Sequence, residues 1–194
     1  MYNISIIIVT YNEEKHISRA IRSCLDQSLP RNEYEIIVVN DGSTDKTKNI
    51  LSTFQGFYAG LPFIKVITLG ESMGIGYASN KGIEQALGQY VVRVDADDYV
   101  NNKMLEIGQL FLNMNKEFDA VACDYLIVNE YGETIERKSC ETDPIACGIM
   151  FRKDKLIDAG LYDDSLRRGE DVDLRKRFMG NIYHIPLPLY RYRK

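Results

Sequence analysis

Tyr90-Val-Val-Arg-Val-Asp95-Ala-Asp97-Asp98-Tyr99 is the stretch that decides the fold, because a run of β-branched apolar residues ends there in a cluster of carboxylates. The valines suit a buried strand of a sheet that is covered on both faces, whereas a cluster of acids cannot be core. Packed carboxylates repel one another and raise each other's pKa unless a cation lies between them. The Asp-x-Asp pattern therefore has two interpretations: a solvated acidic turn, or a site for Mg²⁺ or Mn²⁺.

The totals favour one soluble domain. A chain of 194 residues can bury one sizeable core, and a hydrophobic content of 45% with 27% charged residues is ordinary for a globular protein. The net charge of -4 argues against broad binding to nucleic acid. Basic residues gather late in the chain and form either a solvated face or a phosphate-binding patch. They are Arg167, Arg168, Arg175, Lys176, Arg177, Arg191, Arg193 and Lys194.

The cysteines and the N-terminus bear on the cellular compartment. Cys24, Cys123, Cys140 and Cys147 form no Cys-x-x-Cys pair and have no histidine at zinc-finger spacing, so we interpret them as reduced cytosolic thiols. The sequence begins without a basic leader or a cleavage signal, and it has no apolar segment of membrane-spanning length. We expect a cytoplasmic protein, and this expectation is compatible with attachment to the inner face of a membrane.

Strand-like and helix-like stretches alternate along the first half of the chain. Apolar runs predict strands at residues 4–9, 34–40, 63–69 and 90–94, and helical spacing predicts helices at 17–25, around 50–54 and at 79–87. This alternation is typical of right-handed βαβ units with a parallel sheet, in which ligands bind beyond the carboxyl ends of the strands. Thr10 with Tyr11, Asp41 and Asp95 each follow a strand directly. We therefore expect these side chains to meet at one edge of the sheet.

The glycine-rich signatures of other nucleotide-binding folds are missing. The turn after the first strand is Thr10-Tyr-Asn-Glu13, where a nicotinamide-binding domain would need Gly-x-Gly-x-x-Gly. Gly74-Ile-Gly76-Tyr-Ala-Ser79 lacks the third glycine and follows the third strand, and the sequence contains no Walker-type phosphate loop.

The second half predicts a mixed sheet. The pattern favours a helix at residues 104–114, a strand at 120–128 and a hairpin turn at 129–133 that leads into a strand up to 137. A short helix ends at Gly160, and another follows Glu170 and Asp171. This acidic pair either caps the helix, whose dipole favours negative charge at its N-terminus, or has a functional role. His184 is more typical of a structural residue than of a catalytic one.

Four motifs in order resemble the family 2 glycosyltransferases of the GT-A fold. They are Ser5-Ile-Ile-Ile-Val-Thr-Tyr-Asn-x-Glu14, Val38-Val-Asn-Asp-Gly-Ser-Thr-Asp45, Asp95-Ala-Asp-Asp98 and Gly169-Glu-Asp-Val-Asp-Leu174. The resemblance covers almost the whole chain. It implies a Rossmann-like three-layer α/β/α sandwich with a mixed, mostly parallel central sheet. It also implies a single domain with a nucleotide-sugar-binding half, residues 1–98, and an acceptor-side half, residues 99–194.

The resemblance implies roles for individual residues. Tyr11 is expected along the nucleotide base, Asp41 at the base edge, and Asp95 and Asp97 at a divalent metal, Mn²⁺ or Mg²⁺. Asp171, with Glu170 beside it, matches the general base. The full set of implied donor-binding residues is Thr10, Tyr11, Glu13, Asp41, Asn80, Asp95, Ala96, Asp97, Arg191 and Arg193.

One departure from the family shifts the expected phosphate contacts. Many relatives carry Ala-Arg-Asn in the third helix, where this chain has Ala78-Ser79-Asn80. The chain thus has one positive charge fewer near the donor. Phosphate neutralisation is therefore expected to rest on the metal and on Arg191 or Arg193.

The function implied by the resemblance is transfer of a sugar, with inversion, from a nucleotide-diphosphate-sugar to a hydroxyl of a glycan or lipid-linked acceptor. Two other classes are open. A non-catalytic nucleotide-sugar sensor would not need Asp171, and a sugar nucleotidyltransferase would be expected to have a Gly-rich basic loop in place of residues 10–13. The donor base, the sugar, the acceptor and the oligomeric state are not set by the sequence.

Overall fold

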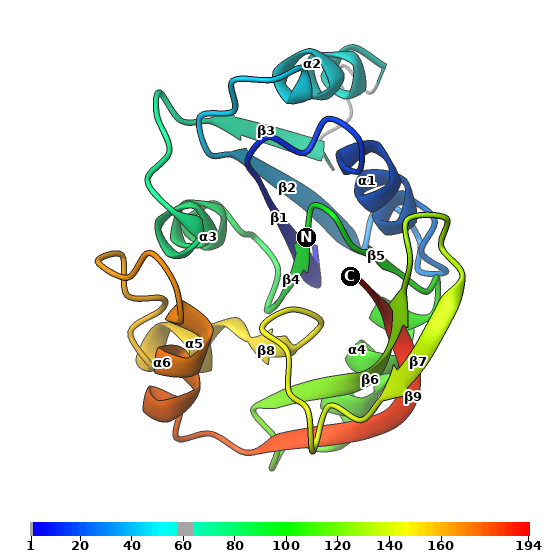
Figure 1. The fold of residues 1–194 in the computed structure, drawn as a ribbon. Helices are drawn as coiled ribbons and strands as arrows, with labels where there is room; N and C mark the ends of the chain where they lie inside the picture. The colour runs from blue at the N-terminus through cyan, green and yellow to red at the C-terminus, as the bar shows by residue number, and fades with distance from the viewer. Residues whose placement is uncertain (1, 58–63) are drawn as a thin grey trace.

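The chain folds around one mixed, curled sheet with helices packed on both of its faces (Figure 1). The structure, a computed structural model, describes residues 2–57 and 64–194. The strands are β1 (Ile4–Thr10), β2 (Tyr34–Asn40), β3 (Ile64–Thr68), β4 (Tyr90–Asp95), β5 (Tyr99–Val100), β6 (Ala120–Val128), β7 (Thr134–Lys138), β8 (Met150–Arg152) and β9 (Ile182–Arg193). The helices are α1 (Ile17–Leu25), α2 (Thr47–Phe57), α3 (Ile75–Glu84), α4 (Met104–Met114), α5 (Lys153–Asp158) and α6 (Glu170–Arg177).

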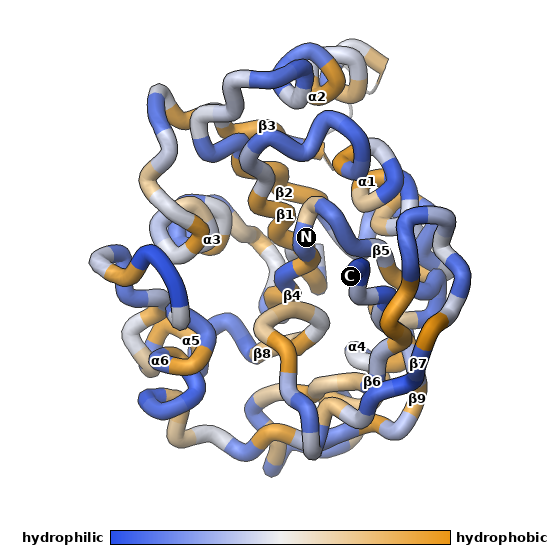
Figure 2. The backbone as a smooth tube through the Cα atoms, viewed as in Figure 1, coloured by the Kyte–Doolittle hydropathy of each residue, from blue (hydrophilic) through white to orange (hydrophobic). Residues whose placement is uncertain are grey.

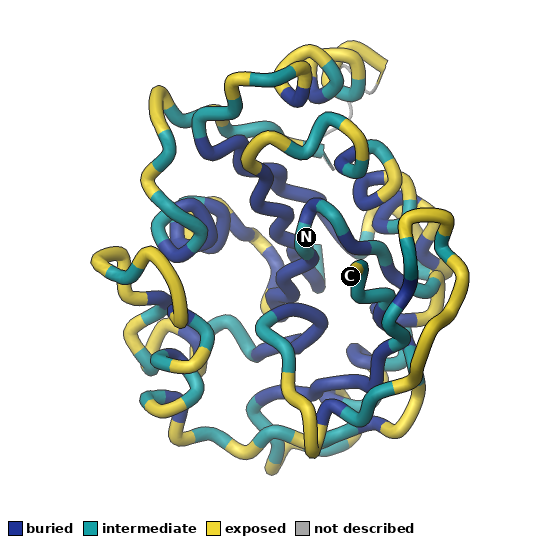
Figure 3. The backbone as a smooth tube through the Cα atoms, in the orientation of Figure 1, coloured by how far each residue is buried: buried dark blue, intermediate teal, exposed yellow. Residues whose placement is uncertain are grey.

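The first half of the sheet is parallel, as the βαβ pattern predicts. Its order is β3-β2-β1-β4, and β1 pairs in parallel with both β2 and β4, so that Ile8 faces Val38 on one side and Val94 on the other. Every residue of β1 and β2 is buried, which explains why these strands are mostly apolar runs. The central strands form the dark blue interior of Figure 3 and the orange bands of Figure 2.

Two hydrophobic clusters lie on the two faces of the sheet and give the predicted three layers. Alternate residues of β1 contribute to them, with Ile6 and Ile8 in one cluster and Ile7 and Val9 in the other. Helices α1, α2 and α4 supply buried residues to the first cluster, and α3, α5 and α6 supply them to the second. The fold class implied by the resemblance is therefore confirmed. None of the described helices is long and apolar enough to cross a membrane.

The second half of the sheet is mixed and contains a long strand, β9, that the sequence pattern does not predict. Strand β8 runs antiparallel to both β4 and β6, whereas β9 runs parallel to β6 and antiparallel to β5. The missed strand β9 is 12 residues long and contains Pro186 and Pro188, which cannot donate to a strand ladder. Its register against β6 shifts between Cys123 and Tyr125, where these prolines are accommodated.

Helix α3 also differs from its prediction, because it spans Ile75–Glu84 and not residues 79–87. Gly74, with φ of 100°, forms the N-cap and turns the chain into the helix four residues earlier than expected. Gly76 is inside the helix because the neighbouring loop approaches closely: a Cβ at this position would lie 3.2 Å from the Asp163 carbonyl oxygen. The predicted strand at residues 63–69 is β3, Ile64–Thr68, and Phe63 lies outside the described residues.

Candidate active site

Polar side chains from separate strands meet in one cavity of about 290 Å³ at the carboxyl ends of β1, β2 and β4, as the parallel sheet predicts. Residues of two loops, one after β3 and one before α6, also line the cavity. Six of the predicted donor-binding residues line the cavity: Tyr11, Glu13, Asp41, Asp95, Ala96 and Asp97. Tyr11 is 48% exposed, which leaves its ring available for stacking.

The segment after β1 is held by the segment after β2. The side-chain oxygen of Asn12, a residue with φ of 56°, accepts hydrogen bonds from Thr44 N at 2.7 Å and Asp45 N at 3.3 Å. The Ser43 hydroxyl accepts one in return from Asn12 N at 3.0 Å. Because Asn tolerates a left-handed backbone, this turn is fixed without glycine, and it holds the neighbouring Tyr11 at the cavity.

Asp41 is buried at the cavity wall and organises the loop after β3. Its carboxylate accepts hydrogen bonds from the Ser72 hydroxyl at 2.7 Å, from Met73 N at 2.8 Å and from Gly74 N at 3.0 Å. These donors place the loop that carries the start of α3. Asp41 thus has a structural role in addition to its predicted contact with the base edge, which stays a prediction.

The turn from Asp95 to Asp98 is held by hydrogen bonds to residues of β9. Asp98 is buried, and its two oxygens accept hydrogen bonds from the Tyr190 hydroxyl at 2.8 Å and from Arg193 N at 2.7 Å. The same Tyr190 hydroxyl accepts a hydrogen bond from Asp95 N at 3.1 Å. One tyrosine therefore joins the first and last acids of the turn, and Asp98 serves the architecture of the site.

Asp97 projects into the cavity opposite Arg193. The Arg193 guanidinium lies 3.8 Å from the Asp97 carboxylate, and its Nε is buried without a hydrogen-bond partner among the described residues. Burial and the neighbouring Asp95 raise the pKa of the Asp97 carboxyl above its usual value. Burial, together with the neighbouring carboxylates of Asp95 and Asp97, raises the pKa of the Asp98 carboxyl to about 8. Negative charge in this turn is therefore disfavoured unless a cation offsets it.

Asp95 and Asp97 fit an oxygen-preferring divalent cation. Within the described chain, the buried Asp95 Oδ1 atom makes no hydrogen bond and is ion-paired with Arg93, whose Nε lies 3.1 Å away. A carboxylate can accept more than one partner, so Asp95 keeps the capacity to bind a cation as well. Asp95, Asp98 and Cys147 also offer ligand atoms within 4.8 Å of one another. However, the Asp98 oxygens are already hydrogen-bonded, and burial raises the pKa of the Cys147 thiol well above its usual value. Carboxylates on the cavity side are therefore the ligands that suit Mg²⁺ or Mn²⁺.

Glu170 and Asp171 open α6, but they face different surroundings. Glu170 is buried and accepts a hydrogen bond from Arg93 Nη1 at 3.3 Å. Arg93 lies on β4, and its Nε is 3.1 Å from Asp95 Oδ1, so that this guanidinium contacts acids of both elements. Burial alone would lower the pKa of Arg93, but Asp95, with smaller contributions from other neighbours that include Glu170, outweighs burial and raises this pKa well above its usual value. Asp171 lines a separate, narrow cavity together with Tyr162 and Arg175.

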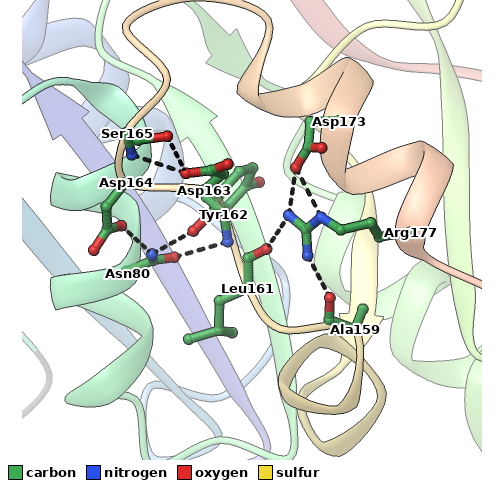
Figure 4. A network of polar contacts seen from close by, with 9 residues as sticks. All are labelled: Asn80, Ala159, Leu161, Tyr162, Asp163, Asp164, Ser165, Asp173 and Arg177. Atoms are coloured by element: carbon green, nitrogen blue, oxygen red, sulfur yellow. Dashed lines mark hydrogen bonds and ion pairs between the residues drawn. The ribbon is translucent and has the colours of Figure 1, made fainter.

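The loop between α5 and α6 is anchored to α3 and carries a cation to the cavity. Asn80 donates from its amide to the Tyr162 carbonyl at 2.8 Å and accepts from Tyr162 N at 3.0 Å, as Figure 4 shows. At the same end of the loop, Arg177 of α6 binds Asp173 and the carbonyls of Ala159 and Leu161 (Figure 4). Further along the loop, Arg167 lines the cavity and donates to the Ser72 carbonyl at 3.3 Å.

Several predicted donor contacts do not line this cavity. Thr10 is buried beneath it, and the Asn80 amide is occupied by the loop backbone. The Arg191 guanidinium donates to the carbonyls of Pro188 and Tyr190, so Arg193 is the late arginine nearer to the acids. Sequence reasoning missed Arg93, Arg167 and Tyr190 as site residues. Two features of the sequence could have indicated these arginines. Arg167 belongs to the basic residues that gather late in the chain, and Arg93 is a charged residue within an otherwise apolar strand.

Comparison with known proteins shows the family and the fold of this chain. A model of the family described as Glycosyl transferase family 2 matches residues 5–164. The poly(ribitol-phosphate) beta-N-acetylglucosaminyltransferase TarS of Staphylococcus aureus (strain Mu50) is 36% identical over 114 residues, which are 58% of this chain and 19% of TarS. The crystal structure of S. aureus TarS 1-349 in complex with UDP-GlcNAc has a TM-score of 0.82 at 25% identity, covering 99% of this chain and 58% of that one.

A second solved structure resembles the fold. The mannosyltransferase PcManGT from Pyrobaculum calidifontis, in complex with GDP-Man and Mn²⁺, has a TM-score of 0.78 at 20% identity, with coverage of 98% of this chain and 57% of that one. The fold is that of the GT-A glycosyltransferases. The chain belongs to glycosyl transferase family 2. It covers less than two thirds of the length of the relatives described here.

Proposed function

We propose that this domain transfers a sugar from a nucleotide-diphosphate-sugar donor to a hydroxyl of a glycan or lipid-linked acceptor, with inversion and with the help of a divalent metal. The observation that carries the proposal is the single cavity in which Tyr11, Asp41, Asp95 and Asp97 meet. An aromatic ring can stack on a base, and an acidic pair can hold the cation that binds a diphosphate. The solved structures of similar fold in complex with UDP-GlcNAc, and with GDP-Man and Mn²⁺, support a nucleotide-sugar as the donor.

The chain's own residues supply binding, orientation and proton transfer. Tyr11 stacks on the base, and Asp41 holds the loop that closes the nucleoside end. Arg167 and Arg193 lie where they can attract the diphosphate, because Arg167 lines the cavity and Arg193 is 3.8 Å from Asp97. Asp171 takes the proton of the acceptor hydroxyl while that oxygen attacks the anomeric carbon. A single displacement of this kind inverts the configuration.

The divalent cation, when bound by Asp95 and Asp97, neutralises charge on the diphosphate and on the departing nucleoside diphosphate. Without it, the diphosphate and the two carboxylates repel each other. Metal-dependent nucleotide binding is therefore the property that follows most directly from the site.

The test measures the binding of UDP and GDP, with and without Mn²⁺, by thermal shift and calorimetry. We expect at least one nucleotide to bind in the presence of Mn²⁺, Asp97→Asn to weaken this binding at least about tenfold with the fold unchanged, and excess chelator to have the same effect. Asp158→Asn is the matched control, because Asp158 is an exposed carboxylate on α5 away from the cavity. Equal affinity of the native protein and the Asp97 variant would contradict the proposed metal site.

Turnover separates the enzyme from a nucleotide-sugar sensor. Hydrolysis of UDP-GlcNAc and GDP-Man by water is followed first, and a panel of glycans and lipid phosphates then serves as acceptors. A native protein that binds donor and never turns it over would favour the sensor.

A further inference from the structure

Arg93 is a buried cation that contacts carboxylates from both halves of the site. Its side chain is 6% exposed, and it sits on β4 opposite Ile7 of β1, in a strand position that would otherwise suit an apolar residue. Its Nε lies 3.1 Å from Asp95 Oδ1, and its Nη1 lies 3.3 Å from Glu170 Oε1. One guanidinium thus joins the metal-binding strand to the helix that carries Asp171.

The surroundings hold this guanidinium in place. The ring of Tyr162, itself buried, lies 5.3 Å from the Arg93 guanidinium carbon, and Tyr162 is fixed through its backbone by Asn80. Gly76 of α3 packs against the loop before α6 and against Glu170, since a Cβ there would lie 3.2 Å from the Asp163 carbonyl oxygen and 3.6 Å from Glu170 Cβ. A charge enclosed in this way cannot turn to water when one of its partners changes, so its interactions with the two carboxylates depend on each other.

On the basis of the proposed function, we propose that Arg93 is a positioning residue that couples occupation of the metal-nucleotide end of the cavity to the N-terminal turn of α6. A cation on Asp95 draws away the negative charge that faces Arg93. The ion pair between Arg93 and Glu170 then becomes stronger. Because Glu170 and Asp171 both lie in the first turn of α6, this turn becomes more ordered. Donor binding in this way prepares the base for the acceptor.

A guanidinium suits this role because its planar fork can contact two carboxylates at once, whereas the ammonium of lysine is a single point charge. Arg93→Lys therefore preserves the charge and removes the bridge. Glu170→Gln removes the ion pair between Arg93 and Glu170 and keeps the ion pair between Arg93 and Asp95. The two variants break the coupling from opposite ends.

The first test is hydrogen exchange of the backbone amides of residues 168–177, with and without saturating Mn²⁺ and UDP or GDP, whichever binds more tightly. We expect the nucleotide and metal to slow exchange in this segment at least about threefold in the native protein, and to have no such effect in Arg93→Lys or Glu170→Gln. Arg137→Lys is the control, because Arg137 binds Asp124 at 2.7 Å away from the cavity and should leave the native response intact. The proposal would be overturned if nucleotide and metal did not slow exchange in the native protein, or if they slowed it equally in Glu170→Gln. If Arg93→Lys does not fold, the Glu170→Gln result alone tests the proposal.

The second test separates positioning from a general loss of structure. Both variants should lower kcat at least about tenfold while the donor KM changes less than about threefold, and the double variant should be no slower than the slower single variant. Additive losses would show that the two residues act independently. A native protein without turnover would refute the proposed function alone, because the exchange experiment reads the coupling without catalysis.

Discussion

Tyr190→Phe is the substitution that tests most directly how the acidic turn is built. The change removes one oxygen from a fully buried side chain on β9 and leaves the ring in place. Two partners lose their hydrogen bond: Asp95 N, now 3.1 Å from the hydroxyl, and the Asp98 carboxylate, now 2.8 Å from it. Phenylalanine cannot replace either interaction.

The expected cost follows from these two partners. A buried polar group that is left unsatisfied costs about 1–3 kcal/mol, and the Asp98 carboxylate keeps its hydrogen bonds from Arg193 N at 2.7 Å and from the Cys147 thiol at 3.7 Å. We therefore expect a loss of about 3 kcal/mol in the free energy of unfolding. For a domain of this size, this corresponds to a fall of about 6–12 °C in Tm.

The assay compares thermal unfolding of Tyr190→Phe with that of Tyr125→Phe. Tyr125 is also a buried tyrosine, but its hydroxyl donates to the Asp143 carbonyl at 3.1 Å near the surface, where water can take its place. This control should cost no more than about 1 kcal/mol. The affinity for nucleotide with Mn²⁺ should fall in Tyr190→Phe alone, because the turn that carries Asp97 is then less fixed. Equal Tm values for the two variants would refute the role given to the Tyr190 hydroxyl.

Three further predictions concern the base, the nucleoside end and the backbone. Asp171→Asn should lower transfer at least about 10²-fold while donor binding persists, which steady-state kinetics and calorimetry can check; transfer at the native rate would remove Asp171 from the mechanism. Asp41→Ala should raise the donor KM more than it lowers kcat, and a collapse of kcat alone would contradict its binding role. Gly42→Ala should destabilise by at least about 1 kcal/mol, because Gly42 has φ of 71° and a Cβ there would lie 2.5 Å from the Glu71 backbone. Gly56→Ala in α2, where a Cβ would meet no atom within 4 Å, should not lower Tm.

The parallel half of the fold could be predicted because each of its strands can be recognised from the pattern of its own residues. Strands β1, β2 and β4 are buried on both faces, so each is a mostly apolar run followed by polar residues. The meeting of Tyr11, Asp41 and Asp95 then follows from topology alone, since parallel strands end at one edge.

The remaining parts depend on long-range contacts that leave no local pattern. Strand β9 is paired on both sides, but its prolines hide the strand pattern. The early start of α3 reflects packing of the loop against Gly76, which outweighs the helix-breaking tendency of glycine. The role of Asp98 could not be inferred either, because its partners Tyr190 and Arg193 lie more than 90 residues away.

The pairing of β9 has a consequence for the order in which the domain can fold. Tyr190 and Arg193 reach Asp98 across separations of 92 and 95 residues, and their strand fits between β6 and β5. Strands β1 to β4 can collapse early through βαβ contacts, whereas closure of so long a loop carries an entropic cost and is slow. During refolding, secondary structure should therefore appear before nucleotide affinity does. A chain on the ribosome would likewise acquire its donor site only after residues 182–193 have emerged.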